Sequence, residues 1–154
     1  MPHAIRTPCI GICSTTYGGD VCRGCKRFSH EVINWNAYDD QQKELVWARL
    51  SRLTEEVVAT RLTVSDDALL AEALRSLGVR FHADRPPAFA AMELLRALGR
   101  QHADLASCGL SPLPGCGHLS PAELYRDLNE DLLARAEAWF DLHHGRARRL
   151  FSGL

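Results

Sequence analysis

Four of the six cysteines of this 154-residue chain lie close together, at Cys9, Cys13, Cys22 and Cys25. Their spacing is C-x3-C-x8-C-x2-C, two short pairs separated by a linker. No apolar export segment follows the first residues, so we expect a cytoplasmic protein whose thiols stay reduced. Metal ligation is then the most economical use of four clustered thiols.

Each cysteine pair contains a glycine that favours a tight turn. The second pair reads Cys22-Arg23-Gly24-Cys25, and Gly24 permits the positive φ that such turns often need. A tetrahedral ion takes four soft ligands at about 2.3 Å, which two facing turns would supply. The pattern therefore predicts a metal knuckle, and the competing interpretation is four reduced cysteines without a metal.

Basic residues surround the second pair. Zinc with four thiolates carries a charge of about −2, which cationic neighbours would compensate. Arg23, Lys26 and Arg27 are placed to do so, and they are also candidate partner contacts. His30 is an alternative ligand, although a capping or surface role competes with that interpretation.

The two cysteine pairs and the residues after them resemble a known bacterial family, DUF1289. The resemblance rests on Thr7-Pro8-Cys9-Ile10-Gly11-Ile12-Cys13-Ser14, on Asp20-Val21-Cys22-Arg23-Gly24-Cys25-Lys26-Arg27, and on Glu31, Ile33, Trp35, Leu45, Leu50 and Arg52. It covers residues 5–60. The family is a short module of unknown function, commonly labelled a predicted iron–sulfur protein. The resemblance implies that the four clustered cysteines are the family's defining ones.

The identity of the ion stays open between zinc and an iron–sulfur cluster. Site charge does not separate them, since an oxidised four-iron cluster with four thiolates also sums to about −2. Two paired knuckles are the usual arrangement of structural zinc, whereas common four-iron sites use C-x2-C-x2-C with a distant fourth cysteine. The spacing therefore favours zinc, with an iron–sulfur cluster as the alternative.

The rest of the chain has helical periodicity. Val46, Leu50, Leu53 and Val57 predict a helix from Asp39 or Asp40 to about Leu62. Three further helices are expected: one capped by Ser65 and ended by Gly78, one opening at Pro86-Pro87 and fading near Leu105, and one from Ser120-Pro121-Ala122-Glu123 to Gly145.

These elements predict a mainly α protein, in which an N-terminal four-cysteine knuckle packs on a bundle of about four helices. No strand of ordinary length is evident. Residues 1–62 would form the metal module with its following helix, and residues 63–154 a helical region of no family that we can name. Trp35 and Trp47 are expected to pack the knuckle onto the helix that follows it.

A second metal site is a weaker hypothesis. Cys108, Cys116 and His118 lie in a Gly- and Pro-rich loop, and His102 precedes it. Their spacing matches no usual ligand pattern, so free cysteines are the competing interpretation.

The function class follows from what the sequence contains and lacks. A net charge of −1 excludes a global basic field that would attract nucleic acid, and no apolar run is long enough to span a bilayer. We expect a non-catalytic adaptor or regulatory protein with a protein partner, or with RNA as the alternative. An iron–sulfur accessory of an oxidoreductase is the competing function. Arg146, Arg148 and Arg149 in the C-terminal tail are further candidate contacts.

Overall fold

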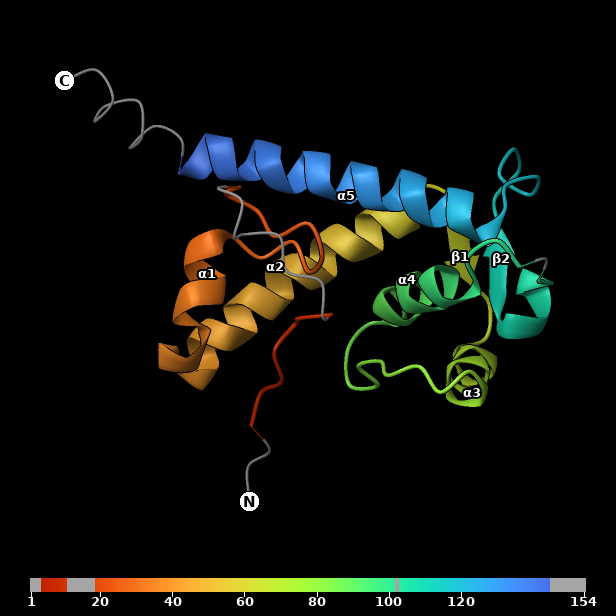
Figure 1. The fold of residues 1–154 in the computed structure, drawn as a ribbon, viewed down its shortest axis with the longest axis horizontal. Helices are drawn as coiled ribbons and strands as arrows, with labels where there is room; N and C mark the ends of the chain where they lie inside the picture. The colour runs from red at the N-terminus through yellow and green to blue at the C-terminus, as the bar shows by residue number, and fades with distance from the viewer. Residues whose placement is uncertain (1–3, 11–18, 102, 145–154) are drawn as a thin grey trace. The chain divides into compact units, whose positions relative to one another are not determined.

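The computed structural model describes residues 4–10, 19–101 and 103–144 (Figure 1). These residues form five α-helices, two 3-10 helices and two short strands, so the prediction of a mainly helical protein is confirmed. The α-helices are α1 (Ser29–Asn34), α2 (Asp40–Val58), α3 (Asp67–Ser76), α4 (Pro87–Leu98) and α5 (Pro121–His143). The 3-10 helices are η2 (Trp35–Ala37) and η3 (Leu105–Cys108), and the strands are β1 (Leu62–Val64) and β2 (Leu110–Pro112).

The chain divides into two compact units. The first unit comprises Met1–Leu50 together with Leu132–Leu154, and the second comprises Ser51–Asp131. Both α2 and α5 therefore contribute one end to each unit. The first unit contains the second cysteine pair and all three tryptophans of the chain, and it is the unit that bears on function.

Aromatic side chains fill the core of the first unit. Phe28, 2% exposed, stacks on Trp139 at a ring separation of 5.4 Å and meets Phe140 edge-on at 5.1 Å. Large buried aromatic rings contribute much of the burial energy available to a core of this size. The other buried apolar side chains of this unit are Val21, Cys22, Trp35, Val46, Trp47, Leu50, Leu132 and Ala136.

The first helix, α1, begins with a side-chain cap. The main-chain N–H of Phe28 donates to Glu31 Oε1 at 2.8 Å, so a carboxylate in the first turn satisfies an amide that the helix leaves free. Helix α1 follows this cap, and η2 continues directly from its end.

The second unit contains a pair of short strands that the helical periodicity of the sequence did not predict. Strands β1 and β2 are antiparallel, with Leu62 opposite Pro112 and Val64 opposite Leu110 (Figure 1). Helix α2 ends at Val58 rather than near Leu62, because the chain leaves the helix to make this pairing. The Thr60 hydroxyl donates to the Val57 carbonyl at 2.6 Å and satisfies one acceptor at the helix end.

Helices α3 and α4 pack together in the second unit and bury apolar faces. Asp66, not Ser65, caps α3, since its carboxylate accepts from the N–H of Ala68 at 2.9 Å and of Leu69 at 3.1 Å. Gly78 ends the segment with φ 68, as predicted. Helix α4 stops at Leu98, earlier than the periodicity indicates, and η3 follows after a short connection.

The predicted start of the last helix is confirmed. The Ser120 N–H donates to Glu123 Oε2 at 2.8 Å, and the Glu123 N–H donates to Ser120 Oγ at 3.2 Å. This reciprocal cap, with Pro121 as the first helical residue, is readable from the sequence. Among the described residues, no helix is both long and apolar enough to cross a bilayer.

Candidate metal centre

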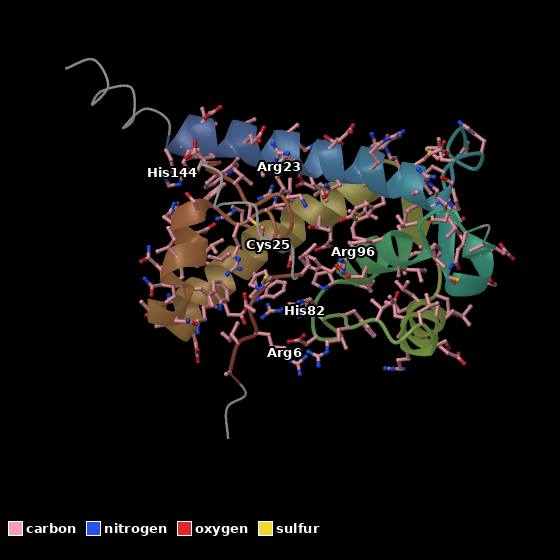
Figure 2. The ribbon with its side chains drawn as sticks, viewed as in Figure 1. Arg6, Arg23, Cys25, His82, Arg96 and His144 are labelled. Carbon is pink, nitrogen blue, oxygen red and sulfur yellow. The ribbon has the colours of Figure 1, made fainter. Side chains whose placement is uncertain are left out.

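The second cysteine pair lies in a hydrogen-bonded turn that leads into α1. The Cys22 N–H donates to the Arg27 carbonyl at 2.8 Å, and the Lys26 N–H donates to the Cys22 carbonyl at 2.8 Å. Val21 and Phe28 form an antiparallel bridge on either side of the turn. The turn therefore reverses the chain within a few residues and holds Cys22 and Cys25 on one loop (Figure 2 labels Cys25).

The left-handed residue of this turn is Lys26, with φ 67, and not Gly24 as the sequence suggested. A non-glycine residue in this conformation costs of order 1 kcal/mol, which the hydrogen bonds of the turn offset. The Lys26 side chain is 6% exposed, and its ammonium group donates to the Gly24 carbonyl at 2.7 Å. The turn thus contains a buried lysine whose ammonium group binds the main chain of the turn itself.

The two thiols of this turn are neighbours. Cys22 is 2% exposed, Cys25 is half-buried, and a side-chain hydrogen bond connects them. This hydrogen bond, and next to it burial, raises the pKa of the Cys25 thiol, while the neighbouring Arg27 cation lowers it. Two soft donors on one turn are what one side of a tetrahedral thiolate site requires.

Arg27 lies against Cys25 and is 4% exposed. Its Nε–H donates to Cys25 Sγ at 3.2 Å, and its guanidinium lies over the Trp35 ring, 5.1 Å from the centroid. Lys43 approaches the same ring at 5.7 Å. Trp35 therefore packs next to the second cysteine pair, as the sequence predicts.

The first cysteine pair is described only in part. Cys9 is exposed, its N–H donates to Thr7 Oγ1 at 3.3 Å, and Cys13 lies outside the described residues. Trp47, 1% exposed, donates its indole N–H to the Arg6 carbonyl at 2.9 Å and so holds the segment before Cys9.

The described residues include no group of three side chains of His, Cys, Asp or Glu that could hold a metal ion. The expected four-cysteine knuckle is therefore not seen there, and the second pair is the one of which both cysteines are described. The soft donors of that pair, and the Arg27 cation next to Cys25, fit one side of a thiolate metal site. The ligand set of four cysteines remains a prediction.

An ion pair that sequence reasoning did not find supports the turn. Arg49 on α2 donates to both carboxylate oxygens of Glu31, whose side chain is 6% exposed. The Arg49 guanidinium also lies 4.0 Å from the centroid of the Phe28 ring. Glu31 and Arg49 are 18 positions apart in the sequence, and no local pattern indicates their pairing.

The residues of the possible second metal site differ in how far they are exposed to solvent. Cys108 ends η3, Cys116 is half-buried and His118 is exposed, while His102 lies outside the described residues. A second site from these residues stays a prediction.

Of the candidate contacts, Arg23 is exposed, whereas Lys26 and Arg27 are buried and so present no guanidinium or ammonium group broadly to solvent (Figure 2 labels Arg23). Arg146, Arg148 and Arg149 lie outside the described residues.

Comparison with known proteins gives a family but no activity. The family described as "Protein of unknown function (DUF1289)" matches residues 7–54. The "Uncharacterized protein YdhL" of Escherichia coli K12 is 38% identical over 65 residues, which are 41% of this chain and 80% of that protein. The protein of the same name from E. coli O6:H1 is 36% identical over 64 residues, covering 42% of this chain and 75% of its own. No solved structure matches the chain.

Proposed function

The chain belongs to the DUF1289 family, and from that premise we propose that it is a metal-binding protein in which Cys9, Cys13, Cys22 and Cys25 hold one structural zinc ion. The observation that carries the proposal is the hydrogen-bonded turn Cys22–Arg27, which places Cys22 and Cys25 together on one loop.

The turn has the properties of a preformed half-site. Its backbone hydrogen bonds fix the separation of Cys22 and Cys25 before any ion arrives, so little conformational entropy remains to be lost on binding. A zinc ion would replace the thiol–thiol hydrogen bond with two metal–sulfur bonds of about 2.3 Å.

Local charge supports an anionic site at this turn. Four thiolates around zinc leave a net charge of about −2 that must be balanced if the site is to be buried. Arg27 is a buried cation next to Cys25, and Lys26 is a second buried cation of the same turn, so the turn itself contains charge that would contribute to this balance.

The first pair would complete the site from a segment that is anchored just before it. The hydrogen bond from Trp47 to the Arg6 carbonyl holds the chain three residues before Cys9. Binding of the ion would bring Cys9 from its exposed position to the second pair, which couples metal binding to folding of this segment.

A fully ligated ion has no open position for substrate, so this site favours a structural role over hydrolysis. We propose that the folded module acts as an adaptor or regulatory element through contacts with a protein partner, with RNA as the other class to test. An iron–sulfur cluster on the same four thiols, serving an oxidoreductase, is the alternative that a metal analysis distinguishes.

The test is a metal analysis of the full chain purified without oxygen, together with its absorption spectrum. We expect one zinc ion per chain and no visible absorption band. Iron with acid-labile sulfide, together with a visible absorption band, would instead support the iron–sulfur alternative. A chain that retains no metal, and takes up neither zinc nor iron with sulfide on reconstitution, would overturn the proposal.

A pair of variants assigns the ligands. Cys22→Ser should release the ion and lower amide-exchange protection around residues 19–35, because ligation free energy is folding free energy in small metal modules. Cys116→Ser, the same change at a half-buried cysteine outside this turn, is the control and should keep both the ion and the protection. Full metal retention in Cys22→Ser would contradict the ligand assignment.

A further inference from the structure

Arg27 is a buried cation directed at a sulfur atom. Only 4% of the residue is exposed, and its Nε–H points at Cys25 Sγ at 3.2 Å. A guanidinium removed from water needs an anion or a full set of acceptors, because desolvating an unpaired charge costs several kcal/mol or more.

Arg49, in the same unit, has the carboxylate partner that Arg27 does not have among the described residues. Arg49 binds both oxygens of Glu31, so its charge is neutralised. Among the described residues, no carboxylate forms an ion pair with Arg27, and the group in front of its Nε is Cys25 Sγ. Arg27, which is buried, and Arg49, whose side chain is 22% exposed, therefore differ in the group that they face.

The Trp35 ring does not replace the anionic partner that Arg27 lacks among the described residues. A guanidinium over an indole ring gains about 0.5–2 kcal/mol, and here the ring lies 5.1 Å away and is shared with Lys43. The stacking fixes the plane of the guanidinium. It leaves the Nε–H directed along that plane at Cys25, where a neutral thiol is a weak acceptor and a thiolate would be a strong, charge-matched one.

We propose that Arg27 is a positioning residue of the metal site, which orients Cys25 Sγ toward the ion through its Nε–H and places a positive charge next to the liganded sulfurs. The inference rests on the proposed metal-binding function. Hydrogen-bonded partners of metal ligands orient the ligand and tune its reactivity, and their removal typically costs about 10–100-fold in metal affinity.

The test uses the full chain with zinc as the probe, and chelator competition measures its affinity. Arg27→Gln should lower zinc affinity by about 10-fold or more, because it removes both the charge and the directed donor. Arg27→Lys keeps a charge but places it at the end of a flexible stem, so its affinity should fall between those of Arg27→Gln and the unmodified chain. Arg75→Gln is the control, because it removes an exposed arginine of α3 in the second unit and should leave affinity unchanged.

A second measurement separates positioning from packing. In the zinc-loaded chain, iodoacetamide should alkylate Cys25 faster in Arg27→Gln than in the unmodified chain, while the rate at Cys22 changes less, as mapped by peptide mass spectrometry. A packing role alone would loosen both cysteines equally.

Failure of this inference and failure of the proposed metal-binding function would give different results. If the unmodified chain binds no metal, the function itself is wrong. If it binds zinc and Arg27→Gln has unchanged affinity and an unchanged Cys25 alkylation rate, the positioning role is overturned. If Arg27→Gln loses its helical circular dichroism, the Arg27→Lys variant provides the test. A zinc affinity of Arg27→Lys equal to that of the unmodified chain would then overturn the proposal.

Discussion

Arg49 contacts both carboxylate oxygens of Glu31, with Nη1–Oε2 at 2.7 Å and Nη2–Oε1 at 2.5 Å. The same carboxylate accepts the N–H of Phe28, the residue that closes the cysteine turn. One buried carboxylate thus joins α2 to the start of α1, and the position of the turn depends on a pair that is far from the cysteines in sequence.

Glu31→Gln should destabilise the first unit by about 2–4 kcal/mol, because it leaves the Arg49 guanidinium without its anion in a mostly buried position. All three tryptophans lie in this unit, so their fluorescence during urea unfolding reports on it directly. Glu137→Gln makes the same chemical change at an exposed position of α5 and should alter stability by less than about 0.5 kcal/mol. Equal effects of the two substitutions would show that the ion pair stabilises nothing.

Stability of the first unit should fall in mild acid because of His144. Burial, and next the neighbouring His30, lower the pKa of His144 below its ordinary value of 6.5; His143 and Arg49 act in the same direction, and Glu31 opposes them. The unfolded chain then binds this proton more readily than the folded chain does. The stabilising contribution is therefore complete above about pH 6.5 and is lost as the pH falls through the lowered pKa.

His144→Asn removes this titration and should flatten the corresponding part of the stability profile, measured by tryptophan fluorescence between about pH 5 and pH 8. His118→Asn, an exposed histidine of the second unit, is the control and should leave the profile of the first unit unchanged. Superimposable profiles for the His144→Asn and unmodified chains would show that His144 contributes nothing to the acid sensitivity.

Gly109 should be the least replaceable glycine of the second unit. Its φ is 77, and a Cβ built there would overlap the carbonyl oxygen of Asp66 and lie 3.2 Å from the Leu70 N. Gly109→Ala should cost about 2 kcal/mol or more, because it adds a backbone clash to left-handed strain. Gly115→Ala has φ 90 but meets no atom within 4 Å, so it should cost only about 1–2 kcal/mol. Thermal unfolding followed by circular dichroism compares the two, and an equal loss would show that the close approach to Asp66 is unimportant.

The double substitution Cys108→Ala with Cys116→Ala should leave the metal stoichiometry of the full chain unchanged. These cysteines lie in the second unit, and among the described residues neither belongs to a group of three that could hold a metal. Elemental analysis of the purified variant measures the outcome. Loss of one metal equivalent would establish the second site that their sequence pattern suggested weakly.

Much of the fold could be predicted because the signals are local. The four-residue spacing of apolar positions marks α2 and α5, and Ser120 with Glu123 marks where α5 begins. Two cysteines at C-x2-C spacing predict a turn, and the turn is there. These features depend on residues within one or two helical turns of one another, so the sequence by itself determines them.

Features that join distant residues could not be predicted in this way. The pairing of Leu62 with Pro112, and of Arg49 with Glu31, needs surfaces that meet only in the folded chain. Lys26 adopts a conformation that glycine would favour, because the hydrogen bonds on both sides of it outweigh its local preference. The sequence alone determined the helices and the presence of clustered thiols. Only the tertiary structure decided that Arg27 is buried against Cys25, since burial depends on which residues cover a side chain and not on its neighbours in sequence.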